Sequence, residues 1–322
     1  MSGDYRLHEN VSGSDLASVG NSTGEPNSIM KLGRVVIGID FSAPSIDAAQ
    51  WVARWLASGA ELVLLHVISV PEAPPIVRSR FPDRELLVDT VRVGAEKRLR
   101  EISLSLPAAR IWPEIREGTP AESLIKVADE FAADLVVAGA HGERQGLAEG
   151  LGSTAEHLVR TSTHPVILVT RPRTSRPSHI LVAAEKSDAT TTALRWAAAL
   201  SEPLDARVTA IHVVPGSVAS SALAATGVTG EQPGVGAPSA MTEAPDPWVE
   251  RVMSAGVPRA RAGSEAAFGD AAREILAASE RLEADLVVMG RRAAGNVRRA
   301  ILGSVVNGVL RGATCPVLVV PE

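Results

Sequence analysis

Glycines and hydroxyl side chains recur at close spacing over residues 139–154, directly after an apolar run. The run, ADLVVA at residues 133–138, has the length and apolar character of a buried strand. The pattern Gly-x2-Gly-x9-Gly-Ser-Thr follows it, formed by Gly139, Gly142, Gly152, Ser153 and Thr154. Glycines let a backbone approach a ligand without an intervening Cβ, and a helix that begins at Gly-Ser-Thr offers free amides and hydroxyls to an anion. The pattern predicts a phosphate-binding site.

An acidic residue, Asp40, ends the first predicted strand at residues 35–40. Ligands of open parallel sheets lie outside the carboxyl ends of the strands, at the point where the strand order reverses. In the order 3-2-1-4-5 the first and fourth strands flank that point, so we expect Asp40 and Gly139 to lie near each other. A carboxylate there can accept hydrogen bonds from ribose hydroxyls. Together with the phosphate pattern, Asp40 indicates a nucleotide site.

Each part of this pattern also has a purely structural interpretation. Gly139 and Gly142 could form only a turn, Asp40 could cap a helix, and Ser153 with Thr154 could be only an N-cap. The joint spacing on neighbouring strands favours the nucleotide site.

The same block returns with lower fidelity near the C-terminus. Residues 133–170 align without a gap with residues 284–321, and both stretches contain ADLVV. The second copy differs at three matching positions, with Ala183 for Gly38, Glu185 for Asp40 and Ala293 for Gly142. The sequence therefore predicts a tandem of one fold with two unequal sites, of which the first is the main binding site.

Strands alternate with helices in both copies. In the first copy we expect strands near residues 35–40, 61–67, 110–116, 134–138 and 166–170, and helices from Ser42 and near 85–105, 121–132 and 153–162. In the second copy we expect strands near residues 179–184, 206–214, 284–289 and 317–320, and a helix near 190–200. This alternation predicts an α/β fold, with a five-stranded parallel sheet in each copy, right-handed crossovers and flanking helices.

The expected division of the chain follows its composition. We expect a disordered tail at residues 1–30, a first domain at 31–172, a linker at 173–178 and a second domain at 179–322. The stretch 216–247 is rich in Gly, Ala, Ser and Pro, and we expect a flexible loop there, either a lid or a disordered insertion.

The bulk composition excludes several classes of protein. A formal net charge of -5 argues against a general nucleic-acid binder. No apolar run approaches the roughly 20 residues of a membrane span, and the N-terminus lacks the layout of a signal peptide. The single cysteine, Cys315, excludes an internal disulfide and is compatible with a reducing compartment. We therefore expect a cytoplasmic protein without membrane insertion.

The pattern of glycines and hydroxyls, with Asp40, resembles that of the ATP-binding branch of the universal stress protein family, and the resemblance covers nearly the whole chain after residue 33. It implies two tandem Rossmann-like domains of the adenine nucleotide alpha hydrolase-like class. It further implies that Asp40 and the backbone of Val67 hold the adenosine of ATP, that Ile39 and Ala138 line the pocket, and that the glycines with Ser153 and Thr154 hold the phosphates. A second candidate site comprises Glu185, Val213, Gly290, Gly303 and Ser304. The resemblance also implies that the two fifth strands pair, so that the tandem mimics a dimer of single domains.

No motif of a catalytic centre occurs in the chain. The candidate phosphate loops contain no lysine and no P-loop, and no residues have metal-ligand spacing. We expect a regulatory module whose ATP occupancy is read by an unidentified protein partner. Two alternatives are a weak ATPase, with Mg2+ bound through the phosphates and Arg144 or Arg291 supplying charge, and an interaction scaffold that binds no nucleotide. We also consider a homodimer of the whole chain.

Two further groups of residues draw attention. Four arginines surround the degenerate loop of the second copy: Arg291, Arg292, Arg298 and Arg299. They form either a solvated basic loop or a contact to an anion or to phosphates held by the partner domain. His66 and His212 recur at matching strand ends, which favours a packing or backbone role, whereas His141 lies between two glycines and could touch phosphate.

Overall fold

The computed structural model describes residues 32–57, 59–69, 84–108, 110–141, 150–215, 246–291 and 303–322. Several predictions of the sequence analysis lie outside these residues: the tail at 1–30, residues 216–245 of the expected loop, and Gly142, Arg144, Arg292, Ala293, Arg298 and Arg299.

The first copy alternates strands and helices as expected. Its elements are β1 (Arg34–Gly38), α1 (Ala43–Trp51), β2 (Glu61–Ile68), α3 (Arg84–Ser105), β3 (Arg110–Glu117), α4 (Pro120–Glu130), β4 (Leu135–Gly139), α5 (Ser153–Thr161) and β5 (Val166–Val169). A π-helical turn, η1 (Val52–Leu56), continues α1.

The second copy repeats this order. Its elements are β6 (His179–Ala184), α6 (Asp188–Leu204), β7 (Arg207–Val214), α8 (Pro247–Ser254), η2 (Arg259–Arg261), β8 (Ala262–Phe268), α9 (Ala271–Arg281), β9 (Leu286–Arg291), α10 (Ser304–Gly312) and β10 (Val317–Pro321). Helix α8 is not among the helices predicted from the sequence. It begins where Asp246 accepts a hydrogen bond from the amide of Trp248 at 2.8 Å. Residues 170–178, between β5 and β6, form neither helix nor strand.

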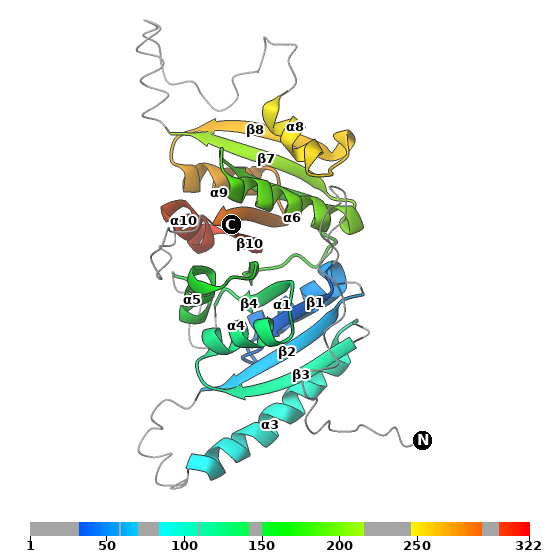
Figure 1. The fold of residues 1–322 in the computed structure, drawn as a ribbon, viewed down its shortest axis with the longest axis vertical. Coiled ribbons are helices and arrows are strands. Elements are labelled where there is room, and N and C mark those ends of the chain that lie inside the picture. The colour runs from blue at the N-terminus through cyan, green and yellow to red at the C-terminus, as the bar shows by residue number, and fades with distance from the viewer. Residues whose placement is uncertain are drawn as a thin grey trace, which may run out of the picture.

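The described strands join one ten-stranded sheet, in the order β3-β2-β1-β4-β5-β10-β9-β6-β7-β8. Each copy contributes five parallel strands in the predicted order 3-2-1-4-5. The expected pairing of the two fifth strands is confirmed, because β5 and β10 pair antiparallel, with Val317 opposite Leu168 and Val319 opposite Val166. Figure 1 shows the two copies as successive halves along the longest axis of the molecule.

Helices cover both faces of this sheet. Side chains alternate between the faces along each strand, so Val35 and Ile37 pack into one hydrophobic cluster and Val36 into the other. Each cluster contains residues of both copies; Ile37 shares its cluster with Val320, and Val36 shares the other with Val319. The two copies therefore share a continuous core on each face. Across the described helices, none is long and apolar enough to cross a membrane.

Candidate functional site

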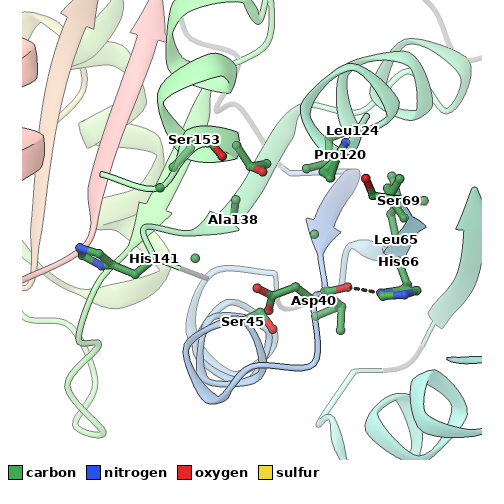
Figure 2. Close-up of a pocket in the computed structure, with 17 residues that line it drawn as sticks. Asp40, Ser45, Leu65, His66, Ser69, Pro120, Leu124, Ala138, His141 and Ser153 are labelled. Atoms are coloured by element: carbon green, nitrogen blue, oxygen red, sulfur yellow. Dashed lines mark hydrogen bonds between the residues drawn. The ribbon is translucent and has the colours of Figure 1, made fainter. Parts of the chain in front are cut away.

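A cavity of about 510 Å³ opens at the carboxyl ends of β1, β2 and β4 (Figure 2). Every predicted first-copy site residue that the structure describes lines it: Ile39, Asp40, Val67, Ala138, Gly139, Gly152, Ser153 and Thr154. Gly142 belongs to the undescribed part of the loop. The structure thus brings together residues that are more than a hundred positions apart in the chain.

The start of α1 orients Asp40. Its Oδ1 atom accepts hydrogen bonds from the amide of Ser42, at 3.0 Å, and from the Ser42 hydroxyl. Ser42 itself is the N-cap of α1, since its side chain accepts from the amide of Ser45. The interpretation of Asp40 as the cap is therefore wrong. Asp40 supports the cap residue and also faces the cavity, as Figure 2 shows.

The N-terminus of α5 forms another wall of the cavity. Gly152 is its N-cap and provides no side-chain hydrogen bond, so the interpretation of Ser153 and Thr154 as an N-cap is also wrong. The first intrahelical bond runs from the amide of Glu156 to the Gly152 carbonyl at 2.9 Å. The amides of the three residues in between precede any helical acceptor. These amides, the two hydroxyls and the helix dipole make this wall suited to an anion.

Close backbone packing explains why a glycine occupies position 139. A Cβ at this position would lie 3.2 Å from the carbonyl oxygen of His141 and 3.6 Å from the amide nitrogen of Ser45. The end of β4 can therefore approach the start of α1 because no side chain separates them. Gly38 has a similar role on β1, where a Cβ would lie 3.1 Å from Cδ1 of Leu124.

His66 forms the β2 side of the cavity. Its Nδ1 atom lies 2.7 Å from the carbonyl oxygen of Ile39, and its ring centroid lies 4.3 Å from that of Phe41. Burial lowers the pKa of His66, which favours a neutral ring that donates Nδ1–H to this carbonyl. The second copy repeats the contact, with Nδ1 of His212 lying 2.9 Å from the carbonyl oxygen of Ala184. The predicted backbone role of both histidines is confirmed.

Several other residues line the cavity but were not predicted as site residues from the sequence: Ser45, Leu65, Ser69, Pro120, Leu124 and Ala155. Pro120 and Leu124 come from α4, which packs over the end of β1. A signal for them was present, because the apolar stripe of α4 must face the sheet beside the switch point. His141 also lines the cavity, on the β4 side in Figure 2.

The predicted second-site residues occupy the corresponding positions at the ends of β6, β7 and β9 and at the start of α10: Glu185, Val213, Gly290, Gly303 and Ser304. Apolar side chains replace two residues that line the first cavity. Met289 matches Ala138, is larger and is only 3% exposed, while Val305 matches Thr154 and lacks its hydroxyl. Ala183 pairs with Met289 on the central strands, where the first copy has Gly38 beside Ala138. The second copy therefore has more apolar volume than the first at these matching positions.

The start of α6 also lies close to β9. A Cβ on Gly290 would lie 2.7 Å from Cβ of Ala189, a closer approach than any at Gly139. Such a distance is closer than real Cβ atoms come to a neighbour, so this region has no room for a larger residue.

Arg291 contradicts the hypothesis of an anion contact. Its Nη1 atom donates to the carbonyl oxygen of Arg160 at 2.8 Å, and Nη2 donates to that of Ser162 at 2.6 Å. Both carbonyls belong to the C-terminal end of α5. The cavity residue Ser153 lies at the other end of this nine-residue helix, about 13 Å away at 1.5 Å per residue. Arg291 therefore neither contacts the candidate phosphate site nor supplies charge there.

We also searched the described residues for clusters of side chains that could bind a metal ion. Within the described ranges, no three His, Cys, Asp or Glu side chains form a group that could hold a metal ion.

The chain matches known proteins along most of its length. Residues 31–170 and 177–321 each match the model of the Universal stress protein family. The universal stress protein Rv2623 of Mycobacterium tuberculosis is 26% identical over 313 residues, which cover 89% of this chain and 96% of that protein. The universal stress protein MJ0531 of Methanocaldococcus jannaschii is 30% identical over 155 residues, covering 46% of this chain and 90% of that protein.

The fold comparison agrees with the sequence comparison. The crystal structure of a universal stress protein from Archaeoglobus fulgidus superposes with a TM-score of 0.67 at 22% sequence identity, over 89% of this chain and 98% of the other. The repeated strand order, the antiparallel junction of β5 with β10 and the two family matches lead to one conclusion. The chain belongs to the universal stress protein family and consists of two tandem domains of that family.

Proposed function

We propose that this protein is an ATP-binding regulatory module, with the nucleotide bound mainly by the first copy. The observation that carries the proposal is the convergence of Asp40, the end of β2 and the N-terminus of α5 on one cavity. Its volume of about 510 Å³ falls in the usual range of small-molecule sites, roughly 300–1,000 Å³.

Each wall suits a different part of ATP. The carboxylate of Asp40 would accept hydrogen bonds from the ribose hydroxyls, and the backbone at Val67 would meet the adenine. The amides and hydroxyls of Ser153 and Thr154 would hold the phosphates. Mg2+ would bind through the phosphate oxygens, since none of the described side chains form a metal cluster.

The second copy would bind ATP weakly or not at all. Met289 and Val305 replace Ala138 and Thr154, which adds apolar volume and removes a hydroxyl at matching positions. Occupancy of the first copy would then be the signal, read in the cytoplasm by a protein partner or by a second copy of this chain. Hydrolysis would be slow, because the candidate phosphate loops contain neither a P-loop nor a lysine that could stabilise a transferring phosphoryl group.

Nucleotide counting and calorimetry test the proposal. Purified wild-type protein is denatured to identify any released nucleotide by mass spectrometry, and nucleotide-free protein is titrated with ATP and Mg2+. We expect about one ATP per chain. Ala138→Met should abolish binding because it places the second copy's side chain in the first cavity. Met289→Leu, a nearly volume-conserving change in the second copy, is the matched control and should bind like wild type.

Other outcomes would change the conclusion. Absence of ATP uptake by folded wild-type protein would refute the proposal and favour the scaffold. Two ATP per chain would refute the restriction to the first copy. Multiple turnovers to ADP, lost in Ala138→Met, would favour the ATPase.

A further inference from the structure

Arg291 connects the second copy to the helix that forms the phosphate end of the first-copy cavity. Its two Nη atoms donate to the carbonyl oxygens of Arg160 and Ser162, 131 and 129 residues away in the chain. The guanidinium is partly buried, and this burial lowers the pKa of Arg291, which still remains a cation at neutral pH. A planar guanidinium can donate to two acceptors at once, so it satisfies two carbonyls that the helix itself leaves without partners.

The helix that Arg291 holds is short. α5 has nine residues, fewer than an isolated helix needs to be stable in water, so its ends depend on tertiary contacts. Its N-cap, Gly152, offers no side-chain hydrogen bond, and its first amides line the cavity. Stabilisation of α5 therefore comes from its packing and from its C-terminal end, where a cation also interacts favourably with the helix dipole.

The second copy makes this arginine contact to the first copy, but the first copy does not make the equivalent contact to the second. The residue of the first copy that matches Arg291 is Ala140, which is fully buried and has no side chain that could reach the end of α10. A symmetric pair of domains would make this contact twice or not at all. The two copies also differ at the matching site positions. The copy with Met289 and Val305 provides the arginine, and the copy with the cavity beside Ala138 and Thr154 receives it.

We propose that Arg291 is a positioning residue for the phosphate end of the first-copy site. By fixing the C-terminal end of α5, it keeps the amides of Ser153 and Thr154 directed into the cavity. The second copy then contributes to ATP binding without binding ATP itself. This proposal rests on the proposed function, because it concerns the affinity of the first-copy site for the phosphates.

Binding of ATP and of adenosine separates positioning from general stability. Calorimetric titrations with each ligand are made on wild type, Arg291→Ala, Arg291→Lys and Arg281→Ala. The last variant is the matched control, since Arg281 also forms a two-pronged contact, to Glu265, but wholly within the second copy. We expect Arg291→Ala to weaken ATP binding about threefold to tenfold and adenosine binding less than twofold. Arg291→Lys keeps the positive charge but loses the planar guanidinium that donates to two acceptors at once. Its ATP affinity should therefore lie between those of wild type and Arg291→Ala.

The alternative results are distinct. If Arg291→Ala weakens ATP and adenosine binding equally, or neither, while wild type binds ATP, Arg291 is only a link between the copies and this inference is overturned. The inference is also overturned if Arg281→Ala weakens ATP binding as much as Arg291→Ala does. If Arg291→Ala does not fold, the ratio of the two affinities in Arg291→Lys decides, because an unchanged ratio overturns positioning. Failure of wild type to bind either ligand would refute the proposed function as well.

Discussion

The Nδ1 atom of His66 lies 2.7 Å from the carbonyl oxygen of Ile39, so a side chain of β2 holds the residue that precedes Asp40. The amide of Ile39 also donates to the carbonyl of Leu65, at 2.8 Å. Strand β2 therefore engages both polar backbone groups of Ile39. These two contacts fix the backbone of the residue before Asp40, which makes His66 a support for the ribose end of the proposed site.

His66→Ala should weaken ATP binding, because the backbone at Ile39 loses one of its two partners and Asp40 loses its orientation. The lost hydrogen bond should also lower the free energy of unfolding by about 1 kcal/mol. His212→Ala removes the equivalent contact in the second copy and is the control. Both variants should lose similar stability in urea titrations, but only His66→Ala should lose ATP affinity. An equal effect on affinity would mean that His66 acts through stability alone.

Thr154 and its counterpart Val305 define a second prediction. Thr154→Val introduces the residue of the second copy without changing the size of the side chain, and it removes one hydroxyl from the phosphate wall. We expect ATP affinity to fall about tenfold to a hundredfold, the usual effect of one hydrogen bond to a charged group. Adenosine affinity should not change, since this wall would face only phosphates. A parallel loss for adenosine in the calorimeter would show that Thr154 faces another part of the ligand.

Stability should fall as the pH decreases below about 6.5, because two histidines have lowered pKa values in the folded protein. Burial lowers the pKa of His66 and of His179, whose ring bonds the Leu282 carbonyl at 3.0 Å and the Thr209 hydroxyl at 2.8 Å. Between the folded value and the unfolded value of 6.5, the unfolded state binds more protons. The free energy of unfolding therefore decreases as the pH falls through this window.

Urea unfolding at pH 7.5 and pH 5.5 measures this effect. The double variant His66→Gln/His179→Gln should show a smaller decrease between the two pH values than wild type, even though it is less stable at pH 7.5. Equal decreases in both proteins would assign the acid sensitivity to other groups.

The sequence was sufficient for the fold and for the residues of the first copy that meet at the cavity from β1, β4 and α5. Alternation of apolar strands with helices indicates a doubly wound sheet, and Gly139 and Asp40 mark its switch point because they lie at the ends of the two neighbouring strands where the strand order reverses. The pairing of β5 with β10 followed from the family resemblance, and their apolar edges require a partner.

Side chains that act over long distances in the chain could not be predicted in the same way. The sequence places Arg291 beside the degenerate loop of the second copy. Its partners are backbone carbonyls, and these cannot be predicted from residue types because every residue has one. The burial of Met289 depends on which face of β9 its side chain occupies. Met289 matches Ala138 in the alignment of the two copies. The structure shows why this difference matters, because both residues lie at the end of a central strand.

Gly290 provides a prediction about the stability of the second copy. A Cβ there would lie 2.7 Å from Cβ of Ala189, so Gly290→Ala forces the start of α6 away from β9. We expect a loss of about 1–3 kcal/mol in the free energy of unfolding, as for other overpacked sites. Gly303→Ala is the control, because a Cβ at Gly303 meets no atom of the described residues within 4 Å. Its loss should be smaller, about 0.5–1 kcal/mol, the usual difference between Gly and Ala at an N-cap.

The reactivity of the Cys315 thiol can report the expected difference in stability between Gly290→Ala and Gly303→Ala. Burial raises its pKa to about 11, and nearby Asp285 adds to the shift. At pH 8 roughly one molecule in a thousand would then carry the reactive thiolate in the folded state. A thiol reagent should therefore label the protein only when the second copy opens. Gly290→Ala should be labelled faster than wild type under native conditions, and the increase for Gly303→Ala should be smaller. Rapid labelling of wild type would contradict the buried position of Cys315, and equal rates in all three proteins would contradict the packing argument at Gly290.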